Sequence, residues 1–211
     1  MTTARIVGLI LLIMIITGCT ATGKATQTVK PITTGYIGPM SGYPAVFGIP
    51  EQHAIEMALE TINENGGING RPLRVVFEDG KCTAKGATDA ANKLIHEEGL
   101  KILLVDCSVE TLATAEIAEP AKVIVLTAWA MHPDITDAGD FVFRTSISDK
   151  DTAKLIAQVM KTKGIQNVGI LTELTGYPSG LRDVLLPALE VQGIQAITES
   201  FTQGSVDVKR N

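Results

Sequence analysis

Three cysteines and three histidines are the residues of this 211-residue chain best suited to metal binding or nucleophilic chemistry. The histidines, His53, His96 and His132, do not have the spacing of metal ligands, so neither a metal site nor a cofactor is predicted. The motifs GxGxxG, Walker A and HExxH are absent from the sequence. Residues 176–180 read GYPSG, which misplaces the serine for a nucleophile elbow. We therefore expect a protein that is not an enzyme.

The first cysteine, Cys19, follows an apolar segment near the N-terminus. Arg5 precedes a run of eleven residues, 6–16, which is apolar apart from one glycine and would span about 16 Å as a helix. That length is too short for a hydrocarbon core of about 30 Å, so residues 1–18 are interpreted as an export signal, with a single-pass anchor as the alternative. The sequence Ile-Thr-Gly-Cys resembles a bacterial lipobox. The resemblance implies cleavage before Cys19 and lipid attachment to its thiol, and hence tethering to a membrane of the cell envelope.

Residues 19–30 are small, polar and rich in threonine, a composition that cannot bury enough surface to offset its ordering entropy. We interpret them as a flexible, lipid-anchored spacer. Removing residues 1–18 takes away one cation, Arg5, and no acid, which leaves 17 basic and 23 acidic residues. This acidic balance, with only 4% aromatic residues, argues against nucleic acid as a partner. It also indicates that lipid, rather than surface charge, would hold the protein at a membrane.

From residue 31 onward, apolar runs alternate with helical patterns. Strands are predicted at 32–38, 73–78, 101–106 and 122–127, and helices at 48–65, 84–98 and 111–118. This alternation favours a parallel sheet covered by helices, an α/β lobe spanning residues 31–145. Residues 131–148 are less regular. A second, partial α/β lobe is predicted for residues 146–211, with helices at 151–163 and 180–192 and strands at 167–172 and 194–201.

The topology of the first lobe predicts where a ligand would bind. In open α/β sheets, ligands collect beyond the carboxyl ends of the strands, where helix N-termini present unpaired N–H groups. Loops at 38–48, 107–110 and 128–133 lie at such ends. Ser108 directly follows the third strand, so its hydroxyl and N–H could bind a ligand carboxylate. The alternative is that Ser108 only caps the next helix.

Cys82 and Cys107 are an even pair in a chain predicted to leave the cytosol. They follow the second and third strands, whose loops leave the same edge of a parallel sheet, so the two residues could come within bridging distance. A bridge across 25 residues would stabilise the fold by about 3.5 kcal/mol in the chain-entropy model. The alternative is two buried free thiols.

Four segments of the sequence carry a specific resemblance. They read TTGYIGPMSGYPAVFG, INENGGINGRPLRVVFEDGKC, DCSVETLATAEIAEP and FVFRTSISD. Together they resemble the leucine/isoleucine/valine-binding family of type I periplasmic binding proteins, the extracytoplasmic receptors of branched-chain amino-acid ABC transporters. The resemblance covers residues 31–211 but only the first lobe and the opening of the second, so we expect either a truncated chain or a second lobe completed by something else.

The resemblance implies roles for individual residues. It implies that Cys82 and Cys107 form a disulfide and that Ser108 holds the ligand's α-carboxylate. Ala130 matches a residue that offers backbone groups to the ligand. Met131 stands where relatives have Ser or Thr, so one hydrogen bond to the carboxylate is lost.

Three aromatic residues complete the expected site. Phe47 matches an aromatic placed against the ligand side chain, with a core position as the alternative. Trp129 is interpreted equally as a hydrophobic lid or as a core residue. Tyr177 resembles a tyrosine that closes over the ligand from the second lobe. The family's acidic residue for the α-amino group would lie beyond Asn211, and these differences allow a ligand other than a common branched-chain amino acid.

The resemblance therefore implies a solute receptor that captures an amino acid or related small molecule between two lobes and hands it to an ABC permease. A ligand-sensing domain of the same fold and a nonfunctional fragment are the alternatives.

Overall fold

The computed structural model describes residues 29–205 of the chain, and the predictions for residues 1–18 and for Cys19 lie outside this range. The spacer prediction overlaps it only at residues 29 and 30, which have no regular secondary structure. Within the described range, no helix combines the length and the apolar character that a membrane span requires.

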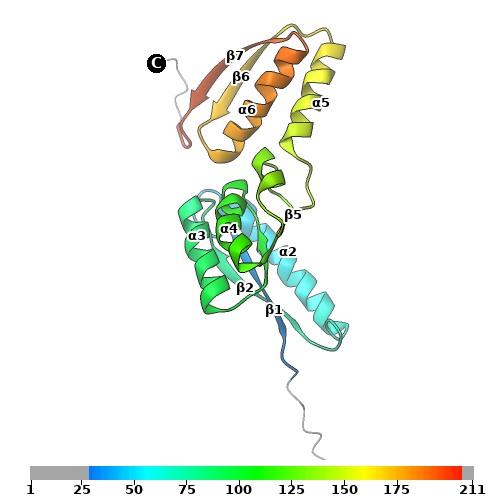
Figure 1. Ribbon diagram of the computed structural model, residues 1–211, viewed down its shortest axis with the longest axis vertical. Coiled ribbons are helices and arrows are strands. Elements are labelled where there is room, and N and C mark those ends of the chain that lie inside the picture. The colour runs from blue at the N-terminus through cyan, green and yellow to red at the C-terminus, as the bar shows by residue number, and fades with distance from the viewer. Residues whose placement is uncertain (1–28, 206–211) are drawn as a thin grey trace, which may run out of the picture. The chain divides into compact units, whose positions relative to one another are not determined.

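A five-stranded parallel sheet organises the first part of the chain (Figure 1). Its strands are β1 (Ile32–Gly38), β2 (Leu73–Asp79), β3 (Ile102–Val105), β4 (Ile124–Thr127) and β5 (Val142–Arg144). Their order is β2-β1-β3-β4-β5, and every neighbouring pair is parallel. All five carboxyl ends therefore lie at one edge of the sheet, which is where the sequence places the candidate binding residues.

Helices connect these strands. They are α2 (Ala45–Glu64), α3 (Ala84–Asn92) continued by the π-helical turn η1 (Lys93–Glu97), α4 (Ser108–Ala121) and the 3₁₀ turn η2 (Pro133–Asp137). The connection from β1 to β2 runs across the sheet in the opposite direction to those from β2 to β3 and from β3 to β4. Because parallel crossovers are right-handed, α2 lies on one face of the sheet and α3 and α4 lie on the other.

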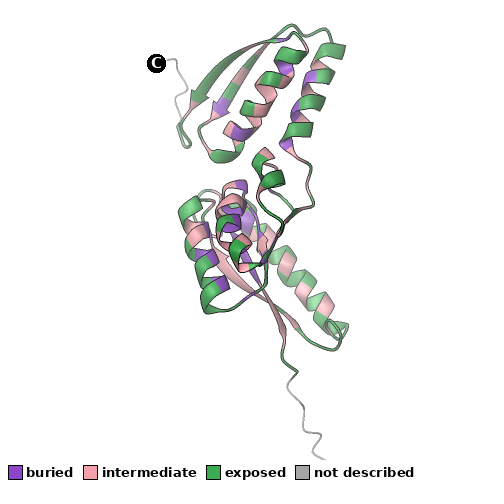
Figure 2. Cartoon of the chain, viewed as in Figure 1, coloured by how far each residue is buried: buried purple, intermediate pink, exposed green. Residues whose placement is uncertain are grey.

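The core of this part lies between the sheet and the pair α3 and α4. It is built from buried aliphatic residues of the strands and alanines of the helices, among them Ile37, Leu103, Val125, Ala91 and Ala118. Helix α2 is covered far less, and only its Gly48 is buried (Figure 2). A Cβ at Gly48 would lie 2.1 Å from the carbonyl oxygen of Pro39, so this position requires glycine for the helix to approach the loop after β1.

The structure corrects the expectation of a four-stranded first lobe. β5 lies in the stretch interpreted as irregular, where Val142, Phe143 and Arg144 pair with Val125, Leu126 and Thr127 of β4. Three residues are too few to show a periodic pattern, so this strand is defined by its partner rather than by its own sequence.

Four helices begin two to four residues earlier than predicted. The predicted starts at 48, 111, 151 and 180 become Ala45, Ser108, Asp149 and Gly176. In each case the first turn lacks the apolar spacing that marks the body of a helix. Polar contacts place two of these starts instead: Glu110 closes a capping box with Cys107, and the Ser148 side chain accepts a hydrogen bond from the N–H of Lys150.

The remainder of the described chain forms a second α/β group. It consists of α5 (Asp149–Thr162), β6 (Asn167–Glu173), α6 (Gly176–Val191) and β7 (Gln195–Phe201). β6 and β7 pair in parallel as a separate two-stranded sheet. Ala157, Leu189 and Ile194 form its small buried core, whereas Leu171 and Ile197 remain exposed on the sheet.

Candidate functional site

Three loops meet at the carboxyl edge of the five-stranded sheet. We call residues 39–47, 106–108 and 128–132 the rim. The backbone N–H of His132 lies 3.4 Å from the Ser108 hydroxyl oxygen, to which it donates a hydrogen bond. The rings of Phe47 and Trp129 lie 6.2 Å apart between centroids. The structure therefore brings Phe47, Ser108 and the loop of Ala130 together, although they are far apart in the sequence.

Ser108 is the first residue of α4 and is only 5% exposed. Cys107 rather than Ser108 occupies the N-cap position, so the capping alternative for Ser108 is wrong. Its hydroxyl therefore does not satisfy the helix's own N–H groups. A hydroxyl beside the positive end of a 14-residue helix is well suited to bind an anionic group.

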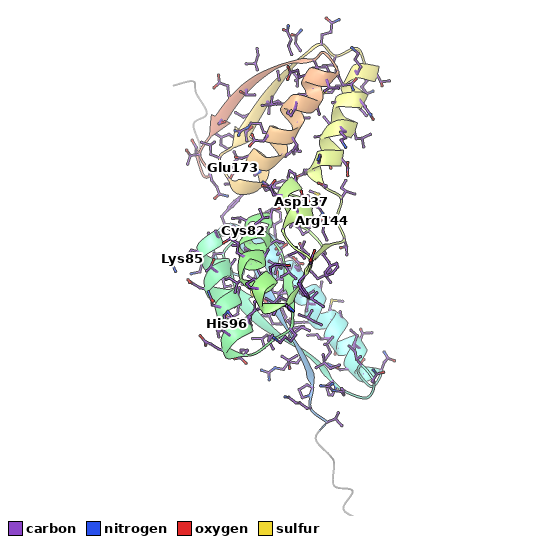
Figure 3. All side chains as sticks on the ribbon, in the orientation of Figure 1. Cys82, Lys85, His96, Asp137, Arg144 and Glu173 are labelled. Carbon is purple, nitrogen blue, oxygen red and sulfur yellow. A yellow bond between two sulfur atoms is a disulfide. The ribbon has the colours of Figure 1, made fainter. Side chains whose placement is uncertain are left out.

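A disulfide joins Cys82, which precedes α3, to Cys107, which precedes α4 (Figure 3). Their Cα atoms lie 5.6 Å apart. The strands that precede the two cysteines, β2 and β3, are not neighbours, because β1 lies between them. The bridge nevertheless forms because both loops leave the same edge of the sheet. It fixes the turn from which Ser108 projects.

The buried carboxylate of Glu110 holds the same two turns, and sequence reasoning did not identify it. Its oxygens accept hydrogen bonds from the backbone N–H groups of Cys82, at 2.8 Å, and of Cys107, at 3.1 Å. Burial raises the pKa of Glu110 to about 7, and these two hydrogen bonds limit the rise. The capping-box position, three residues after the N-cap, is the signal that could have revealed it.

The third loop of the rim is fixed by contacts within the chain. The N–H of Ala130 donates to the Thr127 hydroxyl at 3.1 Å, and its carbonyl accepts from the Ser146 hydroxyl at 2.8 Å. The backbone groups expected to serve a ligand are thus already engaged, although the carbonyl retains a second lone pair. The carbonyl of Met131 accepts from the N–H of Asp149 at 2.9 Å, which ties this loop to the start of α5.

The aromatic residues of the rim are not core residues. Trp129 is 61% exposed and Phe47 is 55% exposed, so the core alternatives for both are wrong. Their rings are inclined by 36° to one another.

Tyr177, the aromatic residue expected from the second lobe, is the second residue of α6 and is partly exposed. Burial and the neighbouring charge of Asp149 raise the pKa of its phenol.

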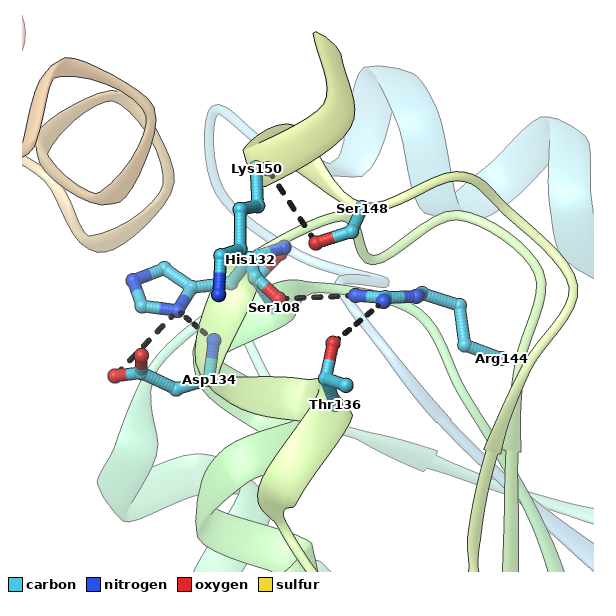
Figure 4. A network of polar contacts seen from close by, with 7 residues as sticks. All are labelled: Ser108, His132, Asp134, Thr136, Arg144, Ser148 and Lys150. Atoms are coloured by element: carbon cyan, nitrogen blue, oxygen red, sulfur yellow. Dashed lines mark hydrogen bonds and ion pairs between the residues drawn. The ribbon is translucent and has the colours of Figure 1, made fainter. Parts of the chain in front are cut away.

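A polar network extends from Ser108 through His132 to Arg144 of β5 and Thr136 of η2 (Figure 4). Arg144 donates to the carbonyl of His132 at 3.0 Å and to the Thr136 hydroxyl at 2.9 Å. The carboxylate of Asp149 is fully buried, and neither of its oxygens has a hydrogen-bond partner in the described structure. Burial raises its pKa, while the nearby charges of His132 and Arg144 oppose the rise. Sequence reasoning did not identify Asp149.

Within residues 29–205, no group of histidine, cysteine and acidic side chains has an arrangement that could hold a metal ion. The rim instead offers a serine hydroxyl, a helix N-terminus, two exposed aromatic rings and buried acids. Such groups can bind an organic solute by hydrogen bonds, charge and ring contacts.

A parallel sheet in the order β2-β1-β3-β4-β5, followed by a second α/β group, is the fold of type I periplasmic binding proteins. Residues 31–210 match the family model described as periplasmic binding protein, and the chain belongs to that family.

Its relatives are solute-binding proteins. The leucine-, isoleucine-, valine-, threonine- and alanine-binding protein of Pseudomonas aeruginosa is 30% identical, over 92% of this chain and 52% of its own. The Leu/Ile/Val-binding protein homolog 3 of Brucella melitensis is 31% identical, over 88% of this chain and 51% of its own. The chain thus spans about half the length of the curated relatives that it matches.

The chain also matches about half the length of solved binding-protein structures. The leucine-binding protein of Thermotoga maritima is 26% identical and superimposes with a TM-score of 0.75, over 83% of this chain and 50% of its own. The branched-chain amino acid transporter substrate-binding protein of Streptococcus pneumoniae, solved with isoleucine, has the same fold, with a TM-score of 0.75 over 84% of this chain and 51% of its own at 24% identity.

Proposed function

We propose that this chain provides the ligand-binding rim of an extracytoplasmic receptor for an ABC transporter that imports a branched-chain amino acid or a related small solute. The observation that carries the proposal is the meeting of Ser108, at the start of α4, with the loop of residues 128–132. The names of the relatives, which bind leucine, isoleucine and valine, support an amino acid as the solute.

In this proposal, the solute's carboxylate binds the Ser108 hydroxyl and the first N–H groups of α4. Charge-assisted hydrogen bonds to a helix N-terminus stabilise an anion without a metal ion or a cofactor. Phe47 and Trp129 contact the rest of the solute from the first lobe, and Tyr177 contacts it from the second. Met131 has no hydroxyl, so the carboxylate receives fewer hydrogen bonds than a serine or threonine there would give.

Closure of the two lobes would bury the solute, as is usual for binding proteins of this architecture. We assign residues 31–145 to the first lobe and 146–211 to the opening of the second, with the hinge in the segment that links β5 to α5. Residues 1–18 direct export, and Cys19 carries the lipid that tethers the receptor near its permease.

Metabolic labelling with a fatty-acid analogue tests the lipid tether. Substituting Cys19 with alanine should abolish the label.

Ser108 is the residue on which solute binding should depend most directly. We expect leucine to shift the backbone amide resonances of Ser108 and of residues 128–132 in the full chain. Ser108→Ala should weaken this binding about tenfold, because it removes one hydrogen bond to a charged group worth about 1.5 kcal/mol. Two-dimensional NMR titration measures both effects, even for millimolar dissociation constants.

Ser200→Ala is the matched control, since Ser200 lies exposed on β7. Leucine-dependent shifts that avoid the rim, or an unchanged affinity in Ser108→Ala, would contradict the proposed site.

A further inference from the structure

Acidic side chains gather at the rim. Asp106 belongs to the rim and directly follows β3, Glu110 lies in the first turn of α4, and Glu51 lies in α2. Asp106 is 2% exposed and Glu110 is fully buried, whereas Glu51 is partly reached by solvent. None of the three takes part in an ion pair among residues 29–205. No cation of the described chain therefore neutralises these acids when they are ionised.

The buried phenol of Tyr36 is a further polar group beside these acids. Tyr36 is fully buried, and its hydroxyl has no hydrogen-bond partner in the described structure. A Cβ at Gly38 would lie 2.1 Å from this hydroxyl, which places the hydroxyl beside the end of β1. The charges of Asp106, Glu51 and Glu110 all act on it. A buried hydroxyl without a partner is costly, and it here faces the acidic cluster.

The aromatic pair borders the same cluster. Phe47 and Glu51 are four residues apart on α2 and therefore share one face of the helix. The Phe47 ring contacts that of Trp129, and both rings are more than half exposed. An exposed aromatic face beside a carboxylate attracts an organic cation, which gains both ring and charge interactions. A metal ion is a poor occupant, because the acids are not arranged as metal ligands.

We propose that the solute bound at this rim carries a positively charged side chain, an ammonium or guanidinium group, that contacts Glu51 and the rings of Phe47 and Trp129 while its carboxylate binds near Ser108. This inference rests on the proposed function and narrows its solute to a basic amino acid. Asp106 is a positioning residue in this arrangement, because it is buried, interacts with Glu51 and acts through it. The Leu/Ile/Val-binding relatives take neutral solutes, so the rim would determine a different specificity.

The test compares solutes of similar shape and different charge. L-lysine is compared with L-norleucine, and L-arginine with L-citrulline, by titrating the full chain and recording the fluorescence of Trp129, the only tryptophan of the sequence. We expect lysine and arginine to bind about 10- to 100-fold more tightly than their neutral counterparts, the effect of one hydrogen bond to a charged group. NMR titration of the rim amides provides a second measure of binding.

Variants assign the preference to residues. Glu51→Gln should remove most of it, and Asp106→Asn should reduce it. Phe47→Leu should weaken lysine binding about two- to fivefold with little effect on norleucine, since only the cation gains from the ring. Glu60→Gln, an exposed acid on the same helix, should change nothing. A cooperative thermal unfolding transition in each variant confirms that the variant is folded before binding is measured.

Proton release gives an independent readout. Burial, contact with Glu51 and the charge of Glu110 raise the pKa of Asp106 to about 8. A cation bound nearby favours the ionised carboxyl, so lysine binding at pH 7 should release protons and norleucine binding should not. Calorimetry in two buffers of different ionisation enthalpy detects this release.

The outcomes separate the inference from the proposed function. Tighter binding of norleucine and leucine at the rim overturns the inference and leaves the proposed function standing. A lysine preference that survives Glu51→Gln also overturns it. Failure of all four solutes and of leucine to perturb the rim overturns both.

Discussion

Substituting both Cys82 and Cys107 with alanine should lower the free energy of unfolding by about 3.5 kcal/mol. The disulfide closes a loop of 25 residues, and in the chain-entropy model its removal restores that much conformational freedom to the unfolded chain. Urea denaturation of the wild type and the double variant measures the difference, and reducing the wild-type disulfide should reproduce it. A loss below about 1 kcal/mol would mean that the unfolded chain gains little from the bridge.

Glu110 makes this experiment more informative. Its hydrogen bonds to the N–H groups of Cys82 and Cys107 exist only in the folded state, whereas the disulfide acts mainly on the unfolded state. Losses from Glu110→Ala and from removal of the disulfide should therefore add to within about 0.5 kcal/mol, even though neighbouring residues commonly couple. Glu116→Ala, an exposed acid on the same helix, is the control for α4. A large coupling energy would show that the bridge mainly positions the folded turns.

Sequence pattern predicted most of the strands because they are short apolar runs bounded by turn residues. The first strand was placed at the residues that the structure assigns to β1, and those of the second group were placed within one residue. Continuous apolar runs of this kind are easy to recognise. β5 was missed because its three residues become a strand only by pairing with β4.

Topology predicts which loops of the proposed site lie together. Loops at the carboxyl ends of parallel strands must lie at one edge, so Ser108 and the loop of Ala130 could be placed together. The buried acids could not be found in this way, because an isolated Asp106 or Glu110 looks like a solvated charge in a sequence. Their burial depends on tertiary packing of the elements around them. Tertiary contacts that the sequence does not reveal also occupy the backbone of Ala130, which is hydrogen-bonded to the side chains of Thr127 and Ser146.

The buried acids should give the protein an unusual dependence of stability on pH. Burial raises the pKa of Asp106 to about 8 and that of Glu110 to about 7. In the unfolded chain both groups regain ordinary values near 4. Between these limits the folded state holds protons that the unfolded state has lost, so stability is greatest at low pH and falls as pH rises towards 8.

We expect the free energy of unfolding to decrease between pH 5 and pH 8 by on the order of 3 kcal/mol. Each unit of pKa shift corresponds to about 1.4 kcal/mol. The total is smaller than the sum over the two acids, because interacting acids titrate together and their shifts do not add. The pKa of Asp79 shifts in the opposite direction. Burial alone would raise it, but hydrogen bonds from Ser41 and from the N–H of Met40 lower it, so the stability that Asp79 contributes is lost only in strong acid.

Urea denaturation at several pH values measures the dependence of stability on pH. Asp106→Asn should flatten it and raise stability at pH 8, because the amide cannot ionise, whereas Glu60→Gln should leave it unchanged. A profile that rises from pH 5 to pH 8 would show that these carboxyls are ionised and satisfied in the folded state.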